Sequence, residues 1–170
     1  QFIAFQLAFL DWISYSQQTP DIIHCHDHHS GLVPFLLYHS KLYKRLANVP
    51  TVFTIHNGQY HGAFGWEHFQ YLPEVDPSST GLLDWAGGIN PLAAAVKCSW
   101  LYTTVSPTYL RELTINSNGL EYLFYIERAK GYGIIAPDLL GFGETSRPTG
   151  LEMYKGEDMA RDIVEILMSE

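Results

Sequence analysis

The sequence predicts an α/β protein, a three-layer α/β/α Rossmann-like sandwich around a parallel sheet of about four strands. The first observation is a pair of apolar runs, PDIIHCHDHHSG at residues 20–31 and VPTVFTIHNGQYHGAFGW at residues 49–66. Each run ends in polar side chains and then glycine, which is typical of a buried parallel strand with functional groups at its carboxyl end. The second observation is that helical segments separate the strand-like runs, which indicates right-handed βαβ units.

The first half of the chain contains two helix-strand pairs. Residues 2–16 are predominantly apolar and predict a core helix, and the β-branched run after them predicts a strand at 21–26. The same alternation predicts a helix at 31–44 and a strand at 51–56. A long irregular stretch is expected over residues 57–87.

The second half continues the alternation with a helix at 91–99 and a strand at 101–106. Ser106 precedes Pro107 and predicts a helix at 107–114, because serine caps a helix and proline is tolerated at its first position. A short helix near 119–129 and a buried strand at 132–137 follow. Met159, Ile163 and Ile166 share one face of a predicted helix at 156–168, which should pack on the sheet.

Length and charge limit the class of protein. A chain of 170 residues is within the range of one domain, so residues 1–170 are expected to form a single α/β unit. The formal charge of −8 argues against a nucleic-acid partner, which needs a basic surface. The first helix lacks a basic flank, and Asp11 interrupts it short of a membrane-spanning length. The two widely spaced cysteines form no disulfide framework, so a cytoplasmic location is expected.

A cluster of histidines at the end of the first predicted strand permits a metal-site interpretation. His24, His26, His28 and His29 surround Asp27, and imidazoles two residues apart at a strand end can share a divalent cation. The metallo-hydrolase pattern, however, places its aspartate four residues after the first histidine, whereas Asp27 comes three after His24. The second ligand cluster of that pattern does not follow, so we predict no metal and no other cofactor.

Five motifs carry a resemblance to a known family. They are HCHDHHSGLVPFLL, TIHNGQYHGAFGW, GLLDWAGGINPLAAAVKCSW, TTVSPTYLREL and SNGLEYLFYIERAKGYGII, in the family's order. Residues 1–134 resemble the second half of the N-terminal Rossmann domain of bacterial glycogen synthases. These are ADP-glucose-dependent glucosyltransferases of glycosyltransferase family 5, which also contains the starch synthases.

The second apolar run suggests a sugar site, and the resemblance adds roles for its residues. His56 ends an apolar strand at a sheet edge, where a neutral imidazole can bond a sugar hydroxyl. The resemblance implies that His56 is the sugar-site histidine and that Asp27 lies beside the donor glucose. It further implies that Asn57 and Gln59 line the acceptor side and that His26 belongs to the same substrate-binding set.

The end of the chain resembles a different family. Residues 135–170 contain APDLLGFGETSRP, which resembles the strand and turn of an epoxide-hydrolase-like α/β-hydrolase. The leading hypothesis is therefore a chimeric or engineered protein joined within residues 131–135, with the strand at 132–137 running across the junction. The family's Lys-x-Gly-Gly loop and its nucleotide-binding domain are not in this sequence. Asp27 and His56 are accordingly expected to be vestigial, with no turnover by the chain alone.

Two alternatives from other classes stay open. One is a residual module that binds ADP-glucose or an α-glucan weakly, or a glucosyltransferase fragment. The other is an enzyme of the α/β-hydrolase class. Self-association is also expected, either through an unpaired edge strand or through the aromatic surface of the first helix, formed by Phe2, Phe5, Phe9 and Trp12.

Overall fold

The computed structural model describes residues 1–136 together with residues 149, 161 and 165. Its α-helices are α1 (Phe2–Tyr15), α2 (Val33–His39), α3 (Pro91–Cys98), α4 (Pro107–Ile115) and α5 (Glu121–Ala129). Its strands are β1 (Ile23–His26), β2 (Thr51–Ile55), β3 (Asp84–Trp85), β4 (Gly88–Ile89), β5 (Leu101–Thr104) and β6 (Ile134–Ile135). Short 3-10 turns are η1 (His28–Ser30), η2 (Lys44–Leu46), η3 (Trp66–Tyr71) and η4 (Pro77–Leu82).

A parallel sheet of four strands organises the fold, in the order β1-β2-β5-β6. Cys25 pairs with Phe53, Phe53 with Tyr102 and Tyr102 with Ile134, so these four side chains lie on the same face. The predicted α/β class and four-stranded parallel sheet are confirmed. Because the strands follow each other in chain order through right-handed connections, the connecting helices lie on one face of the sheet.

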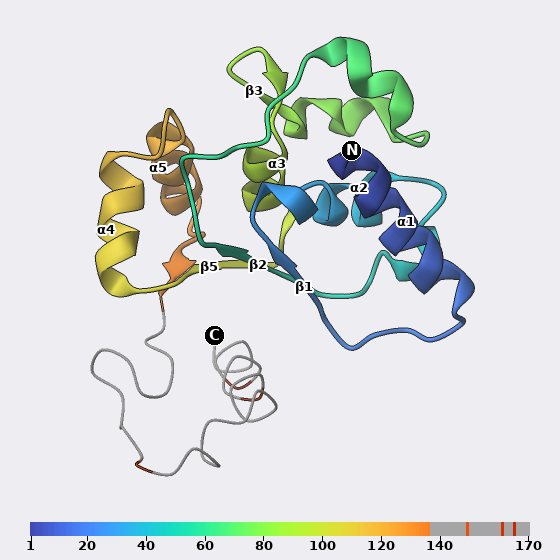
Figure 1. The fold of residues 1–170 in the computed structure, drawn as a ribbon, viewed down its shortest axis with the longest axis horizontal. Helices are drawn as coiled ribbons and strands as arrows, with labels where there is room; N and C mark the ends of the chain where they lie inside the picture. The colour runs from blue at the N-terminus through green and yellow to red at the C-terminus, as the bar shows by residue number, and fades with distance from the viewer. Residues whose placement is uncertain (137–148, 150–160, 162–164, 166–170) are drawn as a thin grey trace.

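The helical layer covers that face. Figure 1 shows α1, α2 and α3 gathered over β1 and β2, with α4 and α5 together beyond β5. Leu10 of α1, Leu36 of α2 and Phe53 of β2 are fully buried in one apolar cluster. Gln6 is buried among them and is satisfied, because its Oε1 accepts a hydrogen bond from the Leu32 N–H at 2.7 Å. This bond ties α1 to the start of α2.

The opposite face of the sheet carries a row of polar side chains. His24 Nε2 and Thr54 Oγ1 are 2.7 Å apart, and Thr54 Oγ1 and Thr103 Oγ1 are also 2.7 Å apart. The row therefore crosses β1, β2 and β5 through hydrogen bonds between side chains. Among the described residues the connecting helices form one layer, so a second helical layer of the predicted sandwich is not part of them.

Several predicted boundaries differ from the structure. The helix expected at 31–44 stops at His39, because Ser40 is extended and bridges to Val75. The strand expected at 132–137 is the two-residue β6, which is half-buried, with Tyr132 exposed before it. The irregular stretch at 57–87 contains η3, η4 and β3. Pro137 and nearly all of the helix predicted at 156–168 lie outside the described residues.

The outer surface of α1 is aromatic. Phe5 is 61 % exposed, Trp12 is 67 % exposed and Phe2 is also exposed, whereas Phe9 is half-buried against the core. Helix α1 therefore presents apolar residues on both of its faces. No helix in the described part of the chain is long and apolar enough to cross a membrane.

We expect Gly31→Ala to destabilise the fold. Gly31 follows η1, and a Cβ there would lie 2.7 Å from the carbonyl carbon of Pro91 at the start of α3. Backbone cannot yield as a side chain can, so the loss in the free energy of unfolding should be about 1–3 kcal/mol. Urea denaturation followed by circular dichroism measures it.

The matched control is Gly81→Ala, because a Cβ on Gly81 would meet nothing within 4 Å. It should change the free energy of unfolding by less than about 1 kcal/mol. Equal effects of the two substitutions would contradict the packing of Gly31 against α3.

Candidate functional site

The carboxyl ends of β1 and β2 bring most of the predicted site residues together. The strands are in parallel register, with His26 opposite Thr54, so the residues after each strand meet at one edge of the sheet. The Asp27 N–H continues the ladder by donating to the Thr54 carbonyl at 3.1 Å. His56 follows β2 directly and lies against His26.

Asp27 joins the two strand ends. Its Oδ1 accepts hydrogen bonds from the backbone N–H groups of His56, at 2.8 Å, and Asn57, at 3.1 Å. Asp27 itself has φ 52° and ψ −177°, a conformation rarely adopted by residues other than glycine. Strain of this kind persists only where the surroundings impose it, and such positions cluster at functional sites. The Asp27 carboxylate therefore sets the backbone of the His56-Asn57 turn.

Three imidazoles lie side by side at this edge. His26 Nδ1 and His56 Nε2 are 2.9 Å apart, and the ring centroids of His24 and His26 are 4.2 Å apart. Partial burial, followed by the neighbouring His26 and His56, lowers the pKa of His24 to about 4. Partial burial and His56 likewise lower the pKa of His26. Both rings are therefore neutral at pH 7 and can donate and accept hydrogen bonds.

Asn57 and Gln59 lie on the loop after β2, which is bonded to the region around α4. The Gly58 N–H donates to the Tyr109 hydroxyl at 2.9 Å. Gln59 donates from Nε2 to the Asn116 carbonyl at 2.7 Å, and its N–H donates to Asn57 Oδ1 at 3.0 Å. These bonds fix the loop relative to the sheet edge.

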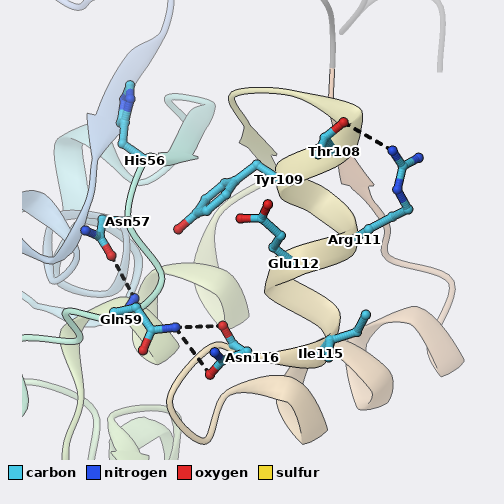
Figure 2. A pocket seen from close by; sticks show the side chains of 9 residues that line it. All are labelled: His56, Asn57, Gln59, Thr108, Tyr109, Arg111, Glu112, Ile115 and Asn116. Carbon is cyan, nitrogen blue, oxygen red and sulfur yellow. Dashed lines mark hydrogen bonds between the residues drawn. The ribbon is translucent and has the colours of Figure 1, made fainter.

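A groove of about 690 Å³ lies between this loop and α4. It is lined by His56, Asn57, Gln59, Thr108, Tyr109, Arg111, Glu112, Ile115 and Asn116. Figure 2 shows Tyr109 and Glu112 pointing toward the loop that carries Asn57 and Gln59, while Arg111 points away from it. The groove combines an aromatic ring, amides and a carboxylate, so its wall offers hydrogen-bond donors and acceptors beside an apolar ring.

The structure separates the predicted residues into two groups. His56, Asn57 and Gln59 line the groove, whereas His26 and Asp27 are not among its lining residues. No role was predicted from the sequence for Tyr109, Glu112 and Asn116. Tyr109 and Glu112 are three residues apart on one face of α4, and Asn116 comes four residues later, directly after the helix ends. This spacing could have identified them.

The remaining histidines of the cluster point elsewhere. The ring of His28 contacts Phe2, with centroids 5.6 Å apart, and His29 stacks on His28 at 3.9 Å. A Cβ on Gly62 would collide with the His28 ring, so Gly62 allows the loop to pass over it. Within residues 1–136 no group of three or more histidine, cysteine or acidic side chains has a geometry that could hold a metal ion.

The sequence profile described as the starch synthase catalytic domain matches residues 1–125. The chain belongs to this family. It is 52 % identical over 135 residues to the glycogen synthase of Flavobacterium johnsoniae, covering 79 % of this chain and 28 % of that protein. It is 37 % identical over 164 residues to the glycogen synthase of Halalkalibacterium halodurans, covering 95 % of this chain and 34 % of that protein.

A solved structure agrees with this family membership. The catalytic domain of starch synthase IV from Arabidopsis thaliana, bound to ADP and acarbose, matches with a TM-score of 0.64 and 28 % identity. The match covers 79 % of this chain and 29 % of that chain. The family member described here thus spans about a third or less of the length of these relatives. Its resemblance to glycogen and starch synthases is confirmed for the N-terminal part.

We expect the stability of the fold to decrease below pH 6.5 in a way that depends on His24. Its folded-state pKa lies near 4 and its ordinary value is 6.5, so between these values the unfolded chain binds a proton that the folded chain does not. The free energy of unfolding therefore falls as pH drops from 6.5 toward 4. His24→Gln should make this slope shallower, measured by urea denaturation across the pH range.

The control is His68→Gln on η3, which makes the same replacement at an exposed imidazole away from the site. A slope equally steep in His24→Gln and in the parent would show that the desolvated His24 does not govern acid stability.

Proposed function

We propose that this chain forms the sugar-facing part of an ADP-glucose-dependent glucosyltransferase that extends an α-glucan. The observation that carries the proposal is the His56-Asn57 turn, which Asp27 fixes at the sheet edge beside the groove. Membership of the starch synthase family supports the transferase class. The ADP and acarbose bound to the starch synthase IV structure support a nucleotide and a sugar as ligands.

The chemistry of the turn fits a sugar ligand. A sugar ring offers hydroxyl groups that both donate and accept hydrogen bonds, and a neutral imidazole or an amide can satisfy either need. In this proposal His56 contacts the transferred glucose, and Asn57 and Gln59 contact the acceptor. The side-chain Nε2 of Gln59 already donates to Asn116. Its side-chain oxygen, Oε1, is therefore the atom that would bond the acceptor sugar. The whole reaction also needs cationic groups that stabilise the departing diphosphate.

We expect His56 to contribute to catalysis in a complete enzyme. In a hybrid, the aligned 135 residues of this chain replace the corresponding segment of the F. johnsoniae synthase, where the two are 52 % identical. His56→Ala should lower kcat about 100-fold, the typical loss when a donor to a developing charge is removed. Release of ADP from ADP-glucose in the presence of glycogen measures the rate.

The matched control in the hybrid is His68→Ala on η3, which should keep the parent rate because His68 does not line the groove. Retention of the parent rate by His56→Ala would contradict the proposal. Calorimetry of the 170-residue chain with a maltooligosaccharide is the accompanying binding measurement.

The hydrolase-like origin of residues 135–170, and with it the chimera, stays a prediction. The motif that carried it lies outside the described residues apart from its first residue, Ala136. The alignment with the H. halodurans synthase extends over 164 residues, which favours a synthase origin for much of this segment as well. An esterase and epoxide-hydrolase screen of the purified chain tests the hydrolase class, and turnover above a denatured control would support it.

We also propose that the chain self-associates through the outer face of α1. Phe2, Phe5 and Trp12 form an exposed stripe at helical spacing, while the opposite face of α1 is buried. Light scattering should give a mass that rises with concentration up to about 100 μM, where weak dimers become populated. The double substitution Phe5→Ser and Trp12→Ser should restore a constant monomer mass.

The matched control removes an exposed aromatic pair elsewhere. Tyr122 and Tyr125 on α5 are 65 % and 68 % exposed, so replacing both by serine removes a similar apolar surface. That variant should still associate. A constant monomer mass for the parent chain would refute this role of α1.

A further inference from the structure

The contact between His26 and His56 contains one proton. His26 Nδ1 and His56 Nε2 are 2.9 Å apart, the distance of a hydrogen bond. A neutral imidazole carries its proton on one nitrogen only, so one of these two atoms donates and the other accepts. The protonation of the remaining nitrogen of each ring then follows from the direction of this bond. If His56 Nε2 donates to His26, His56 Nδ1 is unprotonated. If His56 Nε2 accepts, His56 Nδ1 carries the proton.

The ring of His26 is held independently of His56. The His26 N–H donates to Ser30 Oγ at 2.6 Å, and Ser30 Oγ donates to the His26 carbonyl at 2.7 Å. The ring also contacts the tilted ring of His24, whose Nε2 lies 2.7 Å from Thr54 Oγ1. Backbone and ring of His26 are therefore both fixed by β1, β2 and η1.

His56 is held at its backbone by a different group. Its N–H donates to Asp27 Oδ1 at 2.8 Å, which fixes the main chain but leaves the side chain free to rotate about Cα–Cβ. The ring of His56 is hydrogen-bonded to His26. Within residues 1–136, His26 is thus the group that can decide the orientation of the His56 ring.

Two other roles for His26 fit the structure less well. His26 is not among the residues that line the groove, so direct contact with a sugar there is disfavoured. A shared metal ion is disfavoured because His24 Nε2 is bonded to Thr54, and the described residues offer no three-ligand group of suitable geometry. The remaining role is to act through His56.

We propose that His26 is a positioning residue that holds the His56 ring through Nε2 and selects its tautomer. His56 Nε2 is then hydrogen-bonded to His26, and His56 Nδ1 is the nitrogen that can bond a ligand hydroxyl. The part of this inference that concerns a sugar rests on the proposed function. The part that concerns the ring and its proton does not, because it follows from the contact between the two side chains.

The experiment uses histidine labelled with ¹⁵N in the 170-residue chain. Ring ¹⁵N shifts distinguish a protonated from an unprotonated nitrogen, so they report the tautomer directly. In the parent chain His56 should show one tautomer, with distinct signals for Nδ1 and Nε2. In His26→Phe, which keeps a ring but removes its nitrogens, the two signals should move toward the average of exchanging tautomers. His26→Ala replaces this variant if the phenylalanine does not fold.

Two further variants serve as controls. His26→Asn places an amide near the position of Nδ1 and should preserve a single tautomer of His56, which a purely structural effect of the substitution would not do. His29→Phe changes an imidazole of the same cluster that is not bonded to His56 and should leave the His56 signals unchanged. Identical His56 signals in the parent, His26→Phe and His26→Ala would overturn the inference.

Kinetics of the hybrid synthase separate this inference from the proposed function. His26→Phe should lower kcat about tenfold, a typical loss for a residue that orients another functional group, with rescue by His26→Asn. Tautomer coupling in the spectra together with an unaffected His56→Ala hybrid would refute the proposed function and leave the positioning role intact. A large loss in His56→Ala without any spectral response to His26→Phe would refute the positioning role alone.

Discussion

The carboxylate of Asp27 is the constraint on which the site depends. It accepts hydrogen bonds from two backbone N–H groups of the residues after β2, and so it fixes the relative position of the two strand ends of the β1–α2–β2 unit. The strained backbone of Asp27 is sustained by its own N–H bond to Thr54 and by the turn through Ser30. Without an acceptor there, these two exposed N–H groups would bond to water, and the turn would lose its link to β1.

The groove depends on a second set of bonds that spans a long sequence distance. The loop after β2 is tied to α4 through Tyr109 and to the end of that helix through Asn116. His61 adds a third link, because its Nε2 lies 2.8 Å from the Ser117 carbonyl and its Nδ1 lies 3.2 Å from Asn90 Nδ2. Asn90 caps α3 at the same time, so the loop, two helices and the sheet edge form one hydrogen-bonded unit.

The neutral state of His24 and His26 suits the environment that the fold creates. Burial on a sheet edge disfavours a charged ring, and neighbouring rings disfavour it further. Two cations there would repel each other, whereas a neutral His26 ring can share a hydrogen bond with His56. The chain covers only about a third of the length of these relatives.

The sequence alone determined the βαβ order, the parallel sheet and the strand ends that carry His26, Asp27 and His56, because apolar runs that end in polar residues are local signals. It did not determine that α2 ends at His39, since a bridge from Ser40 to Val75, 35 residues away, ends that helix. Nor did it separate the groove-lining His56 from His26 behind it. The hydrogen bond between His26 Nδ1 and His56 Nε2 depends on how β1 and β2 pack side by side, and only the tertiary structure decides that.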